Sequence, residues 1–492
     1  MGFSPSDYQF FFTFGYHTNK TSTMQKGLLL PWVLTVLFLL SPMGSFAQIG
    51  KRFASERKVV KDPATGVELI FLTSTEGKGD SKIYQTHNQW TSDGKWLIFR
   101  SNRVPGEAMA VHEESGEMVQ VSEGGFSGML NIARNSMKLY FMRNKRTEAG
   151  TATAQPTGAG GRMASFQVEV VEVDLEKLFA DSKAGTVKEA SAYQKVCGVT
   201  PPELGAGGDM ALDADEERVY FRVGRQEAAK HLPEGTPVEP NFGPRNMGAG
   251  PSGIACMHLK TGTIEHVVSV GFQIGHIQTN PWMPGEIVFC WETGGKAPQR
   301  TWTVRADGTG LRPLYPESEF EWVTHEAVIS KDEVAIAIMG HRPVKPLTTS
   351  NGTGQPAAAD PLNPGQEADW GPSGTREKPT GLGIVNLRTR EMTIAGQTES
   401  GSGLWHVNGS SDGRWAVGDD FKRDIWLIDR HTSEMILLSA GHKATAADHP
   451  HPTFSPDNTK IQIQSAMLSA DNRSMNICVI KLPEQLLKRI YK

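Results

Sequence analysis

The chain has 492 residues, of which 38% are hydrophobic and 21% charged, enough apolar material for a large core. Its 50 basic and 54 acidic residues leave a formal charge of -4 with no long run of either sign, which argues against a nucleic-acid-binding protein. The four cysteines are widely spaced, so they indicate small core residues and not a disulfide framework.

The N-terminus has the pattern of an export signal. Lys26 precedes the apolar run 27–40, and Ser45-Phe46-Ala47 supplies a small-x-small cleavage pattern. A run of roughly 14 residues is short for a membrane span and typical of a signal-peptide core. We expect residues 1–47 to be removed, with Met24 as an alternative true start. The mature chain, 48–492, would then be periplasmic or secreted, with no membrane segment.

After the signal, one pattern recurs: a short apolar strand, a turn rich in Asp, Gly, Asn or Ser, and a second apolar strand. Seven copies of the turn and second strand occupy residues 91–99, 134–141, 213–221, 283–290, 330–338, 410–417 and 455–463. Each copy is followed by a further strand with its own polar turn. Seven four-stranded units at this spacing predict an all-β fold, a seven-bladed β-propeller. Segment 62–72, before the first full unit, is expected to pair with the last blade and close the ring.

Three stretches rich in Gly, Pro, Ala or Thr lengthen the spacing between units. They lie near residues 146–165, 226–252 and 343–379. Such insertions are expected in loops at the faces of the ring, where they can wall a binding site. We predict no secondary structure in them.

Histidines recur just before the polar turns. The six in this position are His87, His276, His325, His406, His449 and His451. This register places them on or beside the innermost strands, so we expect them to converge at one end of the central channel. In an extended strand His449 and His451 would point the same way, as two ligands of one metal ion must. The alternative for this His-Pro-His-Pro segment is a stiff, polyproline-like strand entry.

Imidazoles from several blades suit Mn, Zn, Ni or a similar divalent ion, and His325, His449 and His451 form the candidate set. One reaction suits a metal ion with further histidines beside it that do not bind the metal: removal of the proton α to a carboxylate. A cation neutralises a carboxylate while a neutral base removes the proton α to it.

From Gly275 to Cys478 the sequence resembles the oligogalacturonate lyases, seven-bladed propellers that cleave uronic-acid oligosaccharides by β-elimination with bound Mn. The matching segments are Gly275-His276, Arg300-Thr301-Trp302, Thr324-His325-Glu326, Leu404-Trp405-His406 and His449-Pro450-His451-Pro452. The resemblance implies that His276 is the base, that His325, His449 and His451 hold the metal, and that Arg300 and Arg245 bind the uronate. His406 and His87 complete the expected substrate-binding set.

Two departures from the family pattern bear on the site. Ala446 stands where the family has a glutamine ligand, so Asp448 or His406 would supply the missing ligand. The chain also carries an export signal and long insertions. A related reading is a lyase of ulvan or rhamnose-capped glucuronate, in which His87 is the base.

Two further classes of function remain open. One is a non-catalytic propeller, similar to that of TolB, which binds a partner protein. The other is a glycoside hydrolase, for which Asp209 and Glu326 are the nearest carboxylates; Glu326 fits better as a hydrogen-bonding partner of His325. The histidine register favours the lyase.

Overall fold

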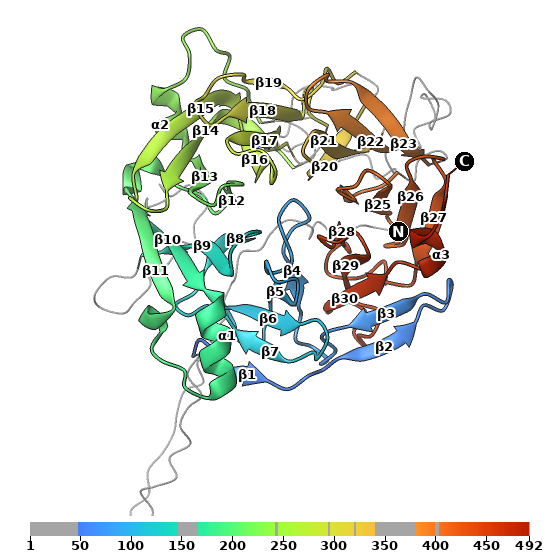
Figure 1. The fold of residues 1–492 in the computed structure, drawn as a ribbon. Helices are drawn as coiled ribbons and strands as arrows, with labels where there is room; N and C mark the ends of the chain where they lie inside the picture. The colour runs from blue at the N-terminus through green and yellow to red at the C-terminus, as the bar shows by residue number, and fades with distance from the viewer. Residues whose placement is uncertain are drawn as a thin grey trace, which may run out of the picture.

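The computed structural model describes residues 48–145, 166–241, 245–293, 296–318, 321–339, 380–398 and 403–491. Within these ranges seven antiparallel sheets surround a central axis, which confirms the predicted seven-bladed β-propeller (Figure 1). The export signal and the insertions 146–165 and 343–379 lie outside the described residues, so what was expected of them stays a prediction.

The first four blades follow the chain in order, with the innermost strand first. Blade 1 contains β4 (Ser81–Lys82), β5 (Trp96–Arg100), β6 (Ala108–His112), β7 (Met118–Gln120) and, outside β7, β1 (Arg52–Phe53). Blade 2 contains β8 (Ser127–Ile132), β9 (Lys138–Asn144), β10 (Val168–Asp174) and β11 (Gln194–Thr200). Blade 3 contains β12 (Met210–Leu212), β13 (Arg218–Val223), β14 (Ala249–His258) and β15 (Ile264–Phe272). Blade 4 contains β16 (Ile274–Thr279), β17 (Glu286–Trp291), β18 (Thr301–Arg305) and β19 (Arg312–Pro313).

The last three blades complete the ring. Blade 5 contains β20 (Val323–Ser330), β21 (Glu333–Ile338), β22 (Gly381–Asn386) and β23 (Met392–Gln397). Blade 6 contains β24 (Val407–Gly409), β25 (Trp415–Asp419), β26 (Ile425–Asp429) and β27 (Met435–Ser439). Blade 7 contains β28 (Thr453–Phe454), β29 (Lys460–Ser465) and β30 (Asn476–Lys481), followed outward by β3 (Glu68–Phe71) and β2 (Lys58–Lys61).

Blade 7 is the point at which the two ends of the chain meet. Strand β3 pairs antiparallel with β30, with Leu69 opposite Ile480 and Phe71 opposite Cys478. The side chains of Leu69 and Phe71 are fully buried. This pairing confirms the predicted closure, and β2 extends it by one more strand.

The described residues also form three short α-helices: α1 (Leu175–Ala184), α2 (Arg225–Lys230) and α3 (Glu484–Leu487). The prediction of no secondary structure across 226–252 is wrong at both ends, because α2 covers its start and β14 begins at Ala249. Helix α1 is capped by Asp174, whose carboxylate accepts from the Lys177 amide at 2.9 Å. No helix in the described part of the chain is long and apolar enough to cross a bilayer.

Apolar side chains pack between neighbouring blades. Leu97 and Phe99 of β5, for example, share a cluster with Ile477 and Val479 of β30, which joins blades 1 and 7. All four cysteines are buried and free, as the sequence predicted: Cys197, Cys256, Cys290 and Cys478. The blades therefore form a rigid frame that holds their inner strands around one channel.

Candidate active site

Five of the six expected histidines gather at one mouth of the channel. We call this set the histidine cluster: His276, His325, His406, His449 and His451. Its members come from blades 4 to 7, each at or just before the innermost strand. The ring of Tyr84, which follows β4 of blade 1, lies within 5.1 Å of the His276 ring and 5.0 Å of the His451 ring. The predicted convergence is therefore observed, with a tyrosine among the imidazoles.

His276 is held in an unusual backbone conformation. Its φ is 49°, and the pairing of β16 with β17 shifts register between Gly275 and Gln278. Left-handed backbone at a non-glycine residue is costly, and bulges of this kind often re-aim a side chain at a functional site. Here the bulge brings the ring to Glu326, whose Oε1 accepts from His276 Nδ1 at 2.9 Å. That short contact keeps the proton on Nδ1 and leaves Nε2 as the basic nitrogen.

Charged groups surround His276 from neighbouring strands. Arg300 donates from Nε to Glu326 Oε2 at 3.1 Å and lies 3.4 Å from Glu292 Oε2. Burial alone would lower the pKa of His276, but the Glu326 carboxylate outweighs it, and the pKa is raised above its ordinary value. Glu326 thus partners His276 and Arg300, where the sequence had suggested His325. Because Glu326 is fully buried and paired, it does not offer a hydrolase an exposed acid.

His406 occupies the middle of the remaining histidines. Its ring centroid lies 3.7 Å from that of His451, 4.3 Å from His325 and 5.1 Å from His449. Potential ligand atoms of His406, Asp419 and His449 all lie within 4.8 Å of one another. The sequence predicted His406 as a substrate-binding residue and, alternatively, as the metal ligand that replaces the missing glutamine. Its central position among the imidazoles fits a metal ligand.

Asp419, at the end of β25, orients two of these imidazoles. Its carboxylate accepts from His449 Nδ1 at 3.0 Å, and His406 Nδ1 lies 3.3 Å away. A carboxylate on Nδ1 fixes the tautomer and leaves Nε2 to coordinate a metal. The Nε2 atom of His406 is buried and has no hydrogen-bond partner among the described residues. Burial raises the pKa of Asp419 to about 6.

The imidazoles at the centre of the cluster are in the form that binds metals. Burial lowers the pKa of both His325 and His406 well below its ordinary value, and neighbouring imidazoles lower it further. Neutral imidazole is the ligand form. The donor set therefore fits a divalent cation of the borderline kind.

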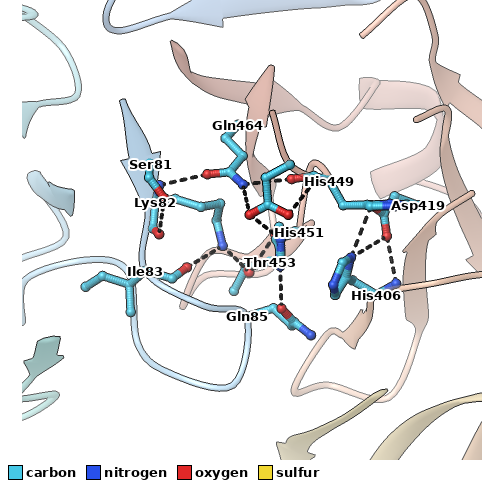
Figure 2. Close-up of polar contacts among 11 residues, drawn as sticks. Ser81, Lys82, Ile83, Gln85, His406, Asp419, His449, His451, Thr453 and Gln464 are labelled. Atoms are coloured by element: carbon cyan, nitrogen blue, oxygen red, sulfur yellow. Dashed lines mark hydrogen bonds and ion pairs between the residues drawn. The ribbon is translucent and has the colours of Figure 1, made fainter. Parts of the chain in front are cut away.

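A polar network of residues from blades 1 and 7 lies against the cluster, as Figure 2 shows. His451 donates from Nδ1 to Gln85 Oε1 at 2.9 Å, while its Nε2 lies 3.0 Å from Asp448 Oδ2. With its proton on Nδ1, His451 Nε2 and the carboxylate are two electron-pair donors, so a proton or a cation must lie between them. Lys82 is buried behind this pair and donates to Thr453 Oγ1 at 2.9 Å.

Other predicted residues lie apart from the cluster. His87 has both ring nitrogens engaged, by Thr86 Oγ1 at 2.7 Å and the Met210 carbonyl at 2.8 Å, and burial lowers its pKa to about 4. Arg245 is exposed in the turn before β14. Ala446, where the lyases that the sequence resembles have a glutamine, packs in a small apolar group with Ala466 and Met475.

Several residues at this mouth escaped the sequence analysis: Asp419 and Glu292 as carboxylates, and Lys82 and Gln464 as supports. Asp419 ends the second strand of its blade and Glu292 directly follows that of its own. A search of the sequence for acidic residues at the end of the second strand of each unit could have found these two carboxylates.

Comparisons with known proteins bear first on the fold. No protein-family model and no curated protein matches the sequence. Among solved structures, an oligogalacturonate lyase in complex with manganese superposes with a TM-score of 0.62 at 17% identity, over 90% of this chain and 100% of that chain. A second oligogalacturonate lyase, from Vibrio parahaemolyticus, gives 0.61 at 15% identity, over 89% and 100%. TolB from Acinetobacter baumannii gives 0.34 at 10% identity, over 85% and 66%.

This likeness establishes the fold. The seven blades of this chain follow the architecture of the two lyases along nearly its whole described length. At these identities the comparison does not assign an activity, which has to come from the histidine cluster.

Proposed function

We propose that the protein is a lyase that cleaves a uronic-acid-containing glycan by β-elimination, with His276 as the base. The observation that carries the proposal is the pairing of His276 Nδ1 with the buried carboxylate of Glu326 at 2.9 Å, beside four further imidazoles. Among the described residues, the carboxylate oxygen within 4.0 Å of Nε2 is that of Glu292, at 3.7 Å and beyond hydrogen-bond reach, so Nε2 can accept a proton. The manganese in one lyase of the same fold supports the proposal.

The chain's own residues would divide the work. His276 Nε2 takes the proton from the carbon next to the uronate carboxylate, and the electron pair of that C–H bond forms the new double bond. The glycosidic oxygen leaves and takes up a proton from water. Glu326 stabilises the imidazolium that forms, and Arg300 offers its positive charge to the uronate carboxylate. Tyr84 presents its ring to the sugar between His276 and His451.

A divalent cation completes the proposed site. His325, His406, His449 and His451 would hold it, with Mn the expected ion. When bound, the cation neutralises the substrate carboxylate and so acidifies the neighbouring C–H bond. His406 joins the three ligands expected from the sequence because of its central position and its buried Nε2.

The proposed setting is outside the cytoplasm, on glycan fragments or polymers. This part of the proposal rests on the export signal in residues 1–47, upstream of the described residues.

Product analysis tests the proposal. The mature protein would be incubated with galacturonan, ulvan and glucuronate-capped arabinogalactan oligosaccharides, and the products weighed by mass spectrometry. Elimination gives one fragment lighter by a water molecule than hydrolysis gives. We expect this fragment from one substrate with the native protein and with His258→Ala, which changes a histidine of blade 3 outside the cluster. His276→Ala should produce none; equal turnover by His276→Ala would refute the assigned base.

A further inference from the structure

Arg300, which lies against the proposed base, is the last residue of the loop that leads into β18. Its guanidinium donates from Nε to Glu326 at 3.1 Å and lies 3.3 Å from His276 Nδ1 and 3.4 Å from Glu292. Only 4% of the side chain is exposed. These contacts depend on where the backbone places Arg300, yet β18 begins one residue later, at Thr301. The groups that fix the backbone here therefore set the position of the charge beside His276.

The carboxylate of Glu317 holds this stretch of backbone. Its Oε2 accepts from the Arg300 amide at 3.0 Å, and its Oε1 accepts from the Thr301 amide at 2.9 Å. The side chain of Gln299 binds the same residue twice: its Nε2 donates to Glu317 Oε1 at 3.0 Å, and its Oε1 accepts from the Glu317 amide at 3.2 Å. Strand β19 ends before this point, so the side chain of Glu317 supplies acceptors that the strand does not.

Glu317 fits these partners as an anion. Three N–H groups face its two oxygens, and an ionised carboxylate accepts hydrogen bonds but donates none. A protonated carboxyl has to turn an O–H away from these donors, and that oxygen becomes a weaker acceptor. Among the described residues, the titratable groups around it are Lys296, Arg300, Tyr315 and Glu321. Desolvation by the surrounding protein outweighs the donors and the positive charges, and raises the pKa of Glu317 to about 7.

We infer that Glu317 is a positioning residue of the proposed lyase: as an anion it holds the backbone from which Arg300 reaches Glu326 and the uronate. The inference rests on the proposed function. None of the hydrogen bonds of Glu317 to described residues goes to the histidine cluster, so it acts through Arg300. When it is neutral, the backbone bonds weaken and the guanidinium shifts relative to His276. A misplacement of about 1 Å can cost about 100-fold in rate; the Trp291 amide, which donates to the Arg300 carbonyl at 2.7 Å, limits the shift, so we expect about tenfold.

Kinetics with two matched variants test this role. Glu317→Gln keeps the size of the side chain and removes its charge at every pH. Glu107→Gln makes the same change in blade 1, where Glu107 accepts from the amides of Gly124 and Gly125 at 3.0 and 2.9 Å. Circular dichroism verifies the fold of both variants. The value of kcat/KM would be measured with the uronic-acid oligosaccharide that the mature protein cleaves, from about pH 5.5 to about pH 8.5, on either side of the Glu317 pKa of about 7.

The ratio of native kcat/KM to that of Glu317→Gln carries the result. We expect about tenfold at the upper end of the pH range and a fall toward one at the lower end, because the native carboxyl is then neutral too. Groups that titrate in both proteins cancel in the ratio. Glu107→Gln should match the native protein throughout. A ratio that stays constant with pH, native kcat/KM in Glu317→Gln, or an equal loss in Glu107→Gln would overturn the inference.

A measurement without turnover separates this inference from the proposed function. Nitrogen–proton correlation NMR of the whole mature protein follows the amides of Arg300 and Thr301 and the Nε–H of Arg300 during a pH titration. We expect a step with a midpoint of about 7 at all three groups, lost in Glu317→Gln and kept in Glu107→Gln. If no uronate is cleaved but this step is present, the proposed lyase is wrong and the positioning of Arg300 by Glu317 stands. If the two amides titrate and the Nε–H does not, or if the step survives in Glu317→Gln, the inference is wrong.

Discussion

The carboxylate of Asp419 offers a sharp test of the proposed cation site. It is fully buried, accepts from His449 Nδ1 at 3.0 Å and lies 3.3 Å from His406 Nδ1. In Asp419→Asn the side chain keeps its size but loses its charge, and one oxygen becomes a donor. Asp419 Oδ2 faces the Nδ1 atoms of both His449 and His406, and Oδ1 accepts from the His406 backbone amide at 2.7 Å. The new NH2 group must therefore face a donor on either side, and the imidazoles lose the carboxylate that fixes the tautomer and orientation presenting Nε2 to a cation.

The size of the effect follows from that count. Loss of a partner that orients a metal-bound histidine typically lowers metal affinity 10- to 100-fold, which corresponds to about 1.4 to 2.7 kcal/mol. Asp419 orients two histidines, so we expect the upper part of that range. The side chain remains the same shape, and the metal-free fold should persist.

The assay is a calorimetric titration that measures the affinity for Mn of the native chain and of each variant. Each protein is first stripped of metal with chelator. Asp213→Asn is the matched control, because Asp213 is also buried and hydrogen-bonded, to Tyr220 Oη at 2.7 Å, but lies in blade 3 away from the cluster. The control should lose stability and keep its Mn affinity. If Asp419→Asn bound Mn as tightly as the native chain, Asp419 would not orient the ligands, and the proposed cation site would be wrong.

Three further predictions concern the base, pH and ring closure. Glu326→Gln should lower kcat by about 100-fold with little change in KM, since His276 loses the partner of its Nδ1 proton; steady-state kinetics measure both. Burial lowers the pKa of His442 from 6.5 to about 4, so unfolding takes up a proton and the native chain should lose up to about 3 kcal/mol of stability as pH falls from 6.5 to 4. Denaturant titrations of His442→Gln should lack this loss. Phe71→Ala should cost about 3 to 5 kcal/mol of unfolding free energy, because β3 closes the ring through a fully buried side chain. If Phe71→Ala cost less unfolding free energy than Glu68→Ala, which changes an exposed residue of the same strand, that role would be contradicted.

The fold could be predicted from sequence because each blade repeats its own local signal. The hydroxyl of Thr91 donates to Asp93 at 2.6 Å, and Ser410 makes the same bond to Asp412 at 2.6 Å. Such turns need only neighbours in the chain, so their pattern is visible in a linear reading. Helix α1 was missed because it interrupts the repeat, although Asp174 as its cap gave a local sign.

The site could be predicted only in part. The register of the histidines within the repeat placed five of them at one mouth, because equivalent positions in a ring converge. Their partners depend on contacts between blades. Asp419 of blade 6 reaches His449 of blade 7, and Glu326 of blade 5 reaches His276 of blade 4 through a bulge. Neither the bulge nor these pairings leaves a pattern in the chain, so Glu326 was assigned to the wrong histidine.

The central claim is cation-assisted β-elimination, and the ultraviolet absorbance of its product tests it most directly. The mature protein would be mixed with each uronic-acid oligosaccharide, with Mn added and, in parallel, with chelator. The new double bond is conjugated with the carboxylate and absorbs in the ultraviolet. The account predicts that absorbance rises with one substrate in Mn and that chelator abolishes the rise. A rise that chelator leaves unchanged would contradict the role of the cation, and no rise with any substrate would favour a binding propeller over a lyase.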